Sequence, residues 1–345
     1  MHDLEYETFE KRKRDHIALA LMPENEAFGF SGLDTITLPH EAIPDLQFSE
    51  IDIHSYRFGK KTNTPFIVSS MTAGHPFAEN INTRLIQACE ETGWAMGIGS
   101  QRRELSDPNA AEEWAALRLS APNVALLGNL GITQLIDISV SDVERLVEAL
   151  EAIGMIIHCN PLQECLQPEG TPYFKGAYEA IAELAENLSV PVIIKETGCG
   201  FSKSTLQRLL STSIAAVDVS GLGGTHWGRI EGARAEQDPI RYRAAQTFKN
   251  WGVSTVDSIR YAASLTPDYE IWGSGGVRNG LDAAKLLYLG ASTIGFAKPM
   301  LEAAKESTDA VITYMKTIEY ELKVALFCTG HSNIEALQES RHGHQ

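Results

Sequence analysis

The chain has 345 residues, 43% of them hydrophobic and 21% charged, with a formal net charge of −16. This balance is typical of a soluble globular protein with a large core, and the negative charge argues against a nucleic-acid-binding surface. No apolar run approaches the roughly 18 residues of a membrane span, and the charged N-terminal stretch lacks the apolar segment of a signal peptide.

The five cysteines are scattered and form no CxxC pair. A disulfide framework or a zinc site is therefore not expected, and reduced thiols fit a cytoplasmic protein. An anionic substrate would need a local source of positive charge. The KRKR run at residues 11–14 offers one, although such a run on its own is more often a solvated helix start.

Eight short β-type runs recur along the chain, most of them apolar on both faces, as in parallel strands covered by helices. They are residues 65–70, 94–100, 124–130, 155–160, 191–198, 215–221, 269–276 and 292–298. Eight alternating units over roughly 240 residues predict an α/β fold, a (β/α)8 (TIM) barrel. We expect a single domain, with residues 1–60 as an N-terminal arm and residues 226–251 as an active-site insertion after strand six.

Helical patterns fill the spaces between these runs. In residues 141–154 the apolar side chains repeat every three to four residues, and we predict Ser141 as the N-cap, with Glu144 three residues on and Gly154 after the end. The pattern at 279–290 stops at Gly290, and residues 307–328 predict a closing helix.

Polar residues cluster where the predicted strands end, which is the catalytic face of such barrels. The fourth strand leads into His158, Asn160, Gln163 and Glu164. The other polar strand ends are Ser69 to Thr72, Gly99 to Arg102, Asn129, Lys195 with Glu196, and Gly221 to Thr225. Six polar ends on successive units indicate a site, because each would otherwise leave unpaired polar groups at the edge of a core.

The last two units carry a possible phosphate site. SGGVRNGLDAAK (274–285) and GFAKP (295–299) place glycines and helix starts after strands seven and eight, where barrel enzymes bind phosphate on backbone N–H groups and helix dipoles. Gly275 and Gly276 would let the backbone approach phosphate oxygens.

Lys195, at the end of an apolar strand, has three possible roles. It could form a Schiff base, stabilise an anionic cofactor ring, or pair with Glu196 or another carboxylate at the rim. The phosphate loops favour a phosphorylated cofactor, for which FMN is the usual choice in such a barrel.

Taken together, these motifs resemble the type II isopentenyl-diphosphate isomerases, which are FMN-dependent barrel enzymes. The resemblance runs through RKRDHI (12–17), SSMTAG (69–74), GSQR (99–102), GNLG (128–131), HCNPLQE (158–164), IKETGCG (194–200), DVSGLGGTHW (218–227) and the two phosphate loops. The departures are Ala73, where a glycine is usual, and Cys159, where an apolar residue is usual.

The resemblance implies interconversion of isopentenyl and dimethylallyl diphosphate, in which reduced FMN acts as both acid and base without net redox change. It further implies Mg2+ on the diphosphate, NAD(P)H as a reductant for the flavin, and a homo-oligomer, either a tetramer or an octamer.

By resemblance, FMN is bound by Ser70, Met71, Thr72, Ser100, Asn129, Lys195, Thr225, Gly275, Gly276, Ala297 and Lys298. The substrate side comprises Arg12, Lys13, Ser100, Gln101, Arg102, His158, Asn160 and Gln163, and Glu164 holds the metal. His158, Asn160 and Gln163 are the expected catalytic residues. Because Gln163 does not titrate near neutral pH, we assign it to orientation or hydrogen bonding near the reacting carbons.

Three other functions remain open from the residues. A hydroxy-acid oxidase shares barrel and phosphate site but needs a His base paired with an Arg for the carboxylate. An aldolase would use Lys195 and be colourless, whereas an FMN protein is yellow. A non-enzymatic flavin-binding barrel would leave the polar group at 158–164 without a role. The fold alone does not decide among them.

Overall fold

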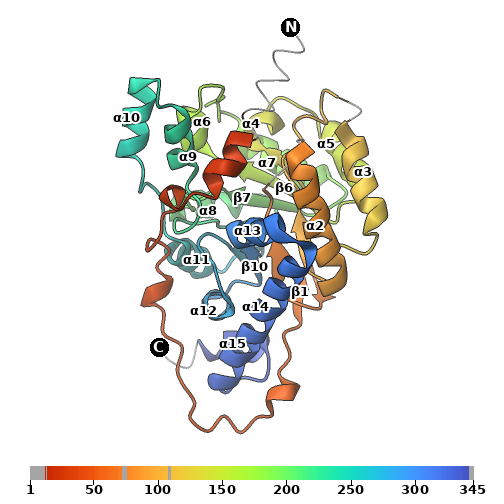
Figure 1. The fold of residues 1–345 in the computed structure, drawn as a ribbon, viewed down its shortest axis with the longest axis vertical. Helices are drawn as coiled ribbons and strands as arrows, with labels where there is room; N and C mark the ends of the chain where they lie inside the picture. The colour runs from red at the N-terminus through yellow and green to blue at the C-terminus, as the bar shows by residue number, and fades with distance from the viewer. Residues whose placement is uncertain (1–11, 13, 72–75, 108–109, 342–345) are drawn as a thin grey trace.

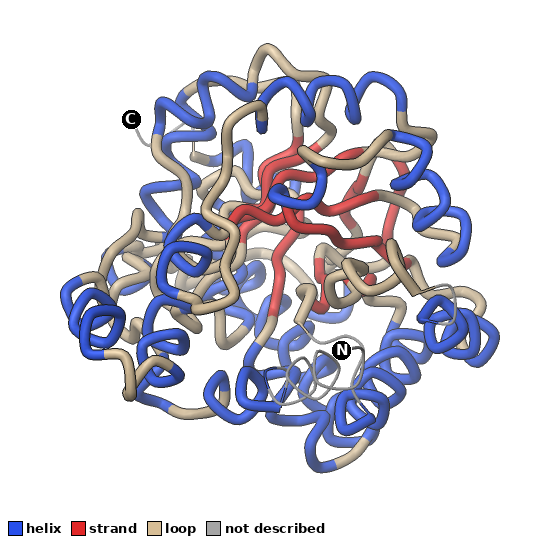
Figure 2. Tube along the Cα trace, turned by 90° about the horizontal axis from the view of Figure 1, so that it is seen from above, coloured by secondary structure: helices blue, strands red, loops and turns tan. Residues whose placement is uncertain are grey.

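The computed structural model describes residues 12, 14–71, 76–107 and 110–341. Its centre is a closed barrel of eight parallel strands, and Figure 2 shows these strands with helices around them. The strands are β3 (Phe66–Val68), β4 (Ala95–Gly97), β5 (Leu126–Gly131), β6 (Met155–Cys159), β7 (Val192–Glu196), β8 (Ala216–Asp218), β9 (Glu270–Gly273) and β10 (Thr293–Phe296). Neighbours in the barrel follow chain order, and β10 closes on β3.

The predicted barrel is therefore confirmed. Each strand lies within its predicted run, except that β5 continues one residue further, to Gly131. These strands are almost entirely buried, as expected for a parallel sheet covered by helices.

Helices follow the strands in the expected alternation. They are α2 (Pro76–Thr92), α3 (Ala110–Ser120), α4 (Ile132–Leu135), α5 (Val140–Leu150), α6 (Pro161–Leu166), α7 (Ala177–Asn187), α8 (Lys203–Leu209), α9 (Trp227–Arg234), α10 (Pro239–Thr247), α11 (Thr255–Ser264), α12 (Gly280–Tyr288), α13 (Lys298–Glu306), α14 (Thr308–Cys328) and α15 (Ile334–Ser340). The predicted stop at Gly290 and the closing helix, here α14, are both found.

The start of α5 corrects a prediction. Ser139 is the N-cap rather than Ser141: its hydroxyl accepts from Asp142 N, and the Asp142 carboxylate accepts from Ser139 N. Both serines have an acid three residues on, but a cap at Ser139 puts Ile138 and Val143 at the two positions of a hydrophobic staple. Val143 is buried in the core and Ile138 packs against it, whereas a cap at Ser141 would put the charged Arg145 at the second position.

The N-terminal end of the barrel is closed by a small hairpin, β1 (Ser55–Arg57) with β2 (Lys60–Thr62). The buried Arg57 guanidinium lies 5.8 Å from the centre of the Trp272 ring, and the Phe58 N–H donates to the Glu270 carboxylate. Trp272 packs inside the barrel with Ile67, Leu127, Ile156 and Ile193. This apolar filling leaves the polar strand ends at the opposite rim.

That rim is covered by two further parts of the chain. The chain forms α9 and α10 between β8 and α11. The predicted long insertion after the sixth barrel strand is therefore present. The arm contributes a helical segment, residues 14–20, and the 3-10 turn η1 (Pro23–Asn25), which contacts α9 (Figure 1). Within the described part of the chain, no helix has the length and apolar character to cross a membrane.

Candidate active site

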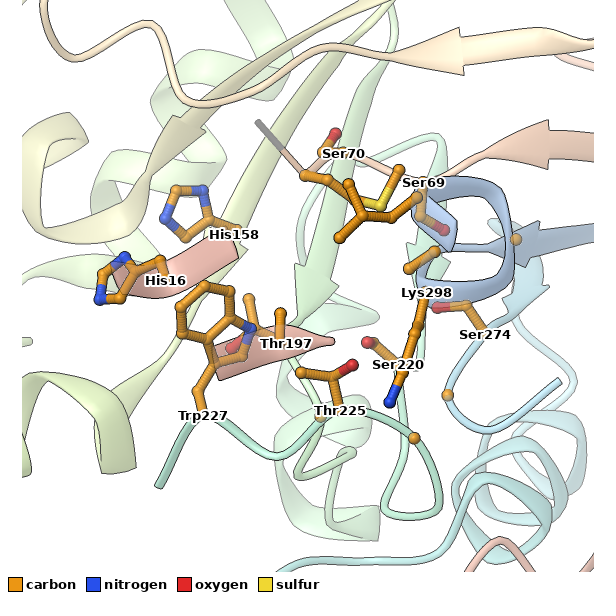
Figure 3. Close-up of a pocket in the computed structure, with 18 of the residues that line it drawn as sticks. His16, Ser69, Ser70, His158, Thr197, Ser220, Thr225, Trp227, Ser274 and Lys298 are labelled. Carbon is orange, nitrogen blue, oxygen red and sulfur yellow. The ribbon is translucent and has the colours of Figure 1, made fainter. Parts of the chain in front are cut away.

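A cavity of about 640 Å³ lies at the carboxyl ends of the strands, within the range of ligand pockets. Figure 3 shows its two sides: His16, His158 and Trp227 lie on one, and Lys298 and Ser274 lie on the other. The strand ends predicted from the sequence line its floor and walls, and the arm and the insertion line its mouth.

The loops after β9 and β10 form one end of the cavity. Gly275 and Gly276 have φ angles of +100° and +79°, which side chains rarely adopt. A Cβ on Gly275 would lie 2.3 Å from the Gly221 carbonyl oxygen, so this tight turn requires glycine. Lys298 begins α13 beside it, and its ammonium group adds a positive charge to the helix N-terminus, a favourable setting for phosphate.

The two cations of this end share one carboxylate from the arm. Glu26 forms ion pairs with Lys298 and with Arg278. Burial opposes its ionisation, but the hydrogen bonds from Lys298 and Arg278 prevail and lower the pKa of Glu26. The backbone next to it is fixed as well, since Ala27 N donates to Gly224 O at 2.8 Å. An internal anion therefore lies on the predicted phosphate site.

Lys195 reaches the floor of the cavity from the end of β7. Its Nζ lies 3.2 Å from the Asp218 carboxylate at the end of β8, and it donates to Glu196 O at 3.0 Å. Of the three roles left open by the sequence, pairing with a rim carboxylate is found, and the partner is Asp218. Lys195 still lines the cavity, so a bound ligand can contact it although it is paired with Asp218.

The Glu196 carboxylate has a different task. It accepts hydrogen bonds from the backbone N–H groups of Thr197, Gly198, Cys199 and Gly200. Burial raises the pKa of Glu196 to about 7 despite these donors. Glu196 thus organises the loop after β7 and is not the partner of Lys195.

Two hydroxyl groups at the end of β3 have no partner among the described residues. They are those of Ser69 and Ser70, and both are buried and line the cavity. Buried polar groups are nearly always hydrogen-bonded, so these two indicate a polar ligand. With Lys195, Lys298 and the glycine turn, they fit a cofactor that carries both a polar ring and a phosphate.

The opposite side is a network of amides and carboxylates after β6. Asn160 Nδ2 donates to the Gln163 carbonyl at 3.0 Å and to the Glu164 carboxylate at 2.9 Å. His158 Nδ1 lies 3.0 Å from Asn129 Oδ1, which fixes the imidazole ring. Of the predicted catalytic residues, Asn160 and Gln163 are therefore in direct contact, and His158 is held separately by Asn129.

Glu231, on α9, completes this network and was not predicted. It is fully buried and accepts from Gln163 Nε2 at 3.1 Å, from His16 Nε2 at 2.9 Å and from Arg234 at 2.6 Å. Burial favours the neutral form, but the bonds and charges of His16 and Arg234 lower the pKa of Glu231. An ionised carboxylate can only accept hydrogen bonds. The NH2 group of Gln163 must therefore face Glu231, and its side-chain carbonyl faces Asn160.

The sequence did contain a signal for Glu231. It lies between Gly228 and Gly232, where a Cβ would come within 2.7 Å of Leu162 and 2.6 Å of Ala245. These glycines let α9 pack closely on α6 and α10, and that close packing buries the acid between them.

Most predicted site residues line the cavity: Arg12, Ser70, Met71, Ser100, Arg102, Asn129, His158, Asn160, Gln163, Glu164, Lys195, Thr225, Gly275, Gly276, Ala297 and Lys298. Gln101 does not line it. Its amide accepts from Asn129 N and donates to Leu146 O, so it supports Asn129 from behind. Lys13, Thr72 and Ala73 lie outside the described residues. The residues that the sequence did not reveal are His16, Glu26, Asp218, Glu231 and Arg278.

Comparison with known proteins gives a consistent picture. The sequence profile of the family described as FMN-dependent dehydrogenase matches residues 165–343. A protein of Legionella pneumophila (strain Corby), named isopentenyl-diphosphate delta-isomerase, is 62% identical over 97% of this chain and 98% of its own length. Proteins of the same name from Bdellovibrio bacteriovorus and a Nostoc species are 52% and 38% identical, each over 96% of this chain and over 97% and 95% of their own lengths.

Solved structures share the fold at low identity. A mandelate oxidase with 3,3-difluoro-2-hydroxy-3-phenylpropionic acid superposes with a TM-score of 0.65 at 18% identity, covering 96% of both chains. A flavocytochrome b2 variant with pyruvate gives a TM-score of 0.66 at 16% identity, over 93% of this chain and 80% of that one.

Glu26 and a bound phosphate group would compete for the same two cations, so we expect Glu26→Gln to bind inorganic phosphate about tenfold more tightly than the wild type. A hydrogen bond to a charged group contributes about 1.5–3 kcal/mol, and about 1.4 kcal/mol corresponds to a tenfold change. Isothermal titration with phosphate measures the change. Glu302→Gln is the matched control, because that carboxylate lies 3.9 Å from the same Lys298 but is largely exposed. Weaker phosphate binding by Glu26→Gln would show that Glu26 holds the cations in place and does not compete.

Proposed function

The chain belongs to the type II, FMN-dependent isopentenyl-diphosphate delta-isomerases, and on this premise we propose that its cavity moves the substrate proton with reduced FMN and Mg2+ bound in it. Isopentenyl and dimethylallyl diphosphate would be interconverted there without net oxidation or reduction. NAD(P)H would serve only to reduce the flavin.

One observation supports the proposal most. The cavity carries positive charge at two separate places: Lys298 with Arg278 at the loops after β9 and β10, and Arg12 with Arg102 on the side of the β6 network. Two such places suit two phosphorylated molecules, the cofactor and the diphosphate substrate, because charge-assisted bonds hold phosphate oxygens most strongly.

FMN, when bound in its reduced form, would supply the proton donor and acceptor that an alkene requires. The residues of the chain bind and orient. Lys298 and the turn at Gly275 and Gly276 would hold the phosphate, and the hydroxyls of Ser69 and Ser70 and the ammonium of Lys195 would contact the ring. Their chemistry and burial fit such a group.

The amide of Gln163 would orient the reacting part of the substrate. It is an uncharged side chain with its orientation set by Glu231 and Asn160, and it cannot donate a proton as an acid does. Together with His158, Asn160 and the loops above them, it would keep water from the reacting carbons.

Mg2+ fits next to Glu164. This carboxylate lines the cavity, where Asn160 Nδ2 and Thr171 N orient it, and the buried Asn160 Oδ1 has no hydrogen-bond partner in the described structure. Mg2+ prefers few protein oxygens together with substrate phosphate and water. The described residues contain no cluster of three or more acidic, histidine or cysteine ligands, so the metal would depend on the diphosphate as well.

The cofactor proposal predicts that the protein binds FMN and turns yellow, that activity needs the reduced flavin, and that no NAD(P)H is consumed per turnover. The absorbance spectrum of the purified protein shows FMN binding. An anaerobic assay with isopentenyl diphosphate, FMN, Mg2+ and NAD(P)H, read by product analysis and by NAD(P)H absorbance, measures the other two. A chemical reductant such as dithionite is the control that separates reduction of the flavin from any role of NAD(P)H in turnover. Consumption of one reductant per product would contradict the isomerase mechanism.

For the metal, we expect Glu164→Gln to raise the Mg2+ concentration needed for half-maximal activity by about tenfold or more, since one charged ligand contact contributes about 1.5–3 kcal/mol. FMN affinity should stay nearly unchanged because the phosphate loops lie on the other side. Mg2+ titration of activity and FMN fluorescence titration give the two values. A wild-type rate that EDTA does not alter would remove the metal from the mechanism.

Substitutions of Arg12 and of Gln163 should change different kinetic constants. Arg12→Ala should mainly raise KM, about ten- to hundredfold, because it removes a contact to the diphosphate. Gln163→Ala should mainly lower kcat, because its contact matters most in the transition state. Steady-state kinetics of both variants, with the bound flavin spectrum as folding control, measures the split. A KM within about twofold of wild type for Arg12→Ala, well under the tenfold that 1.4 kcal/mol represents, would show that the arm does not hold the diphosphate.

A further inference from the structure

A buried ion pair lies in the floor of the cavity. Lys195 and Asp218 are register partners on neighbouring strands β7 and β8, so their side chains leave the barrel wall in the same direction. Both side chains are 7% exposed, and Nζ lies 3.2 Å from Oδ2. The pair is fixed by the strand register and does not depend on a loop.

Asp218 is also held from its other side. Its Oδ1 accepts from Ser274 Oγ at 2.6 Å and from Ser220 N at 3.3 Å. Ser274 directly precedes the Gly275–Gly276 turn of the phosphate loop. Lys195, Ser220 and Ser274 line the cavity, whereas Asp218 is not among the lining residues. Asp218 therefore acts on a ligand through its neighbours.

The pair determines how much positive charge a ligand meets at the floor. A lone lysine would present a full positive charge, and charges in a protein interior interact more strongly than in water. With a carboxylate 3.2 Å behind it, the ammonium presents the positive end of a dipole. The charge placed near a flavin ring is one of the ways in which proteins tune it.

We propose that Asp218 is a positioning residue that sets, through Lys195, how strongly the cavity prefers the reduced flavin over the oxidised flavin. This inference rests on the proposed binding of FMN. Reduction adds negative charge to the ring system, so a fully charged Lys195 would favour the reduced form, and Asp218 limits that preference. The flavin would thus retain the basicity that it needs to take a proton back from the substrate.

The test is Asp218→Asn, which removes the charge and keeps the shape and the acceptor for Ser274. The midpoint potential of bound FMN, from an anaerobic spectroscopic titration against a reference dye, should rise. A tenfold gain in preference for the reduced form corresponds to about 30 mV for a two-electron couple, and we expect a shift of at least this size. An unchanged or lower potential overturns the inference, a lower one because it would show that Asp218 is needed to keep the proton on Lys195.

A double-mutant cycle separates action through Lys195 from action at a distance. In the Lys195→Gln background, Asp218→Asn should change the preference for reduced over oxidised FMN less than threefold. An equal rise in both backgrounds overturns the inference, because Asp218 would then act by its own charge alone.

The cycle also gives a result if Asp218→Asn does not fold. A variant that leaves one buried charge unpaired is strongly destabilised. If Asp218→Asn does not fold, the comparison of Lys195→Gln with the double variant still decides. In Lys195→Gln the Asp218 carboxylate keeps its hydrogen bonds from Ser274 Oγ and Ser220 N, and the double variant has no buried charge at either position. Closely similar potentials of these two variants support the inference, and a marked rise in the double variant overturns it. Absence of FMN binding by the wild type would overturn the proposed function as well, whereas bound FMN with an unchanged potential overturns this inference alone.

Discussion

The register of the eight parallel strands is the constraint on which the site depends. Because all strands run in one direction and their interior is filled by apolar side chains such as Ile156 and Trp272, residues that end neighbouring strands meet at one rim. His158 is the register partner of Lys195, and Lys195 is that of Asp218. A shift of one strand by one residue would turn these side chains into the helical layer, and the floor of the cavity would lose its charges.

The electrostatics of the rim reconcile an acidic protein with anionic ligands. The chain has a net charge of −16, yet its cavity collects cations. Three of them have an internal carboxylate partner: Lys195 has Asp218, and Lys298 and Arg278 share Glu26. A partner lowers the cost of burying each cation and keeps it in place before a ligand arrives, at the expense of some attraction for that ligand.

Much of the fold could be predicted from the sequence because its signals are local. Each strand is a short apolar run of its own, and the polar residues that line the cavity follow these runs directly. The start of α5 was misplaced by two residues because Ser139 and Ser141 offer similar caps, each after an apolar residue, and the choice depends on whether Val143 or Arg145 lies four residues after the cap. The partners were missed for a different reason. Glu26 and Arg278 are 252 residues apart in sequence, and Glu231 meets His16 across 215 residues. No local pattern marks such pairs. The glycines at 228 and 232 mark Glu231 as a closely packed residue, but only the folded chain shows which partners Glu26, Asp218 and Glu231 have.

The arm has a consequence for the order in which the protein is made. Its residues leave the ribosome before the barrel strands, but Glu26 has its ion-pair partners on Arg278 and Lys298, more than 250 residues further along the chain. Contacts between distant segments form late because closing the long intervening loop is costly in entropy. During synthesis Glu26 therefore lacks both of these partners until the strands β9 and β10 and the start of α13 have been made. The mouth of the cavity is then completed late in the nascent protein, and a chain cut short before Lys298 would carry most of the barrel without one of the two cations that Glu26 pairs with at the phosphate end.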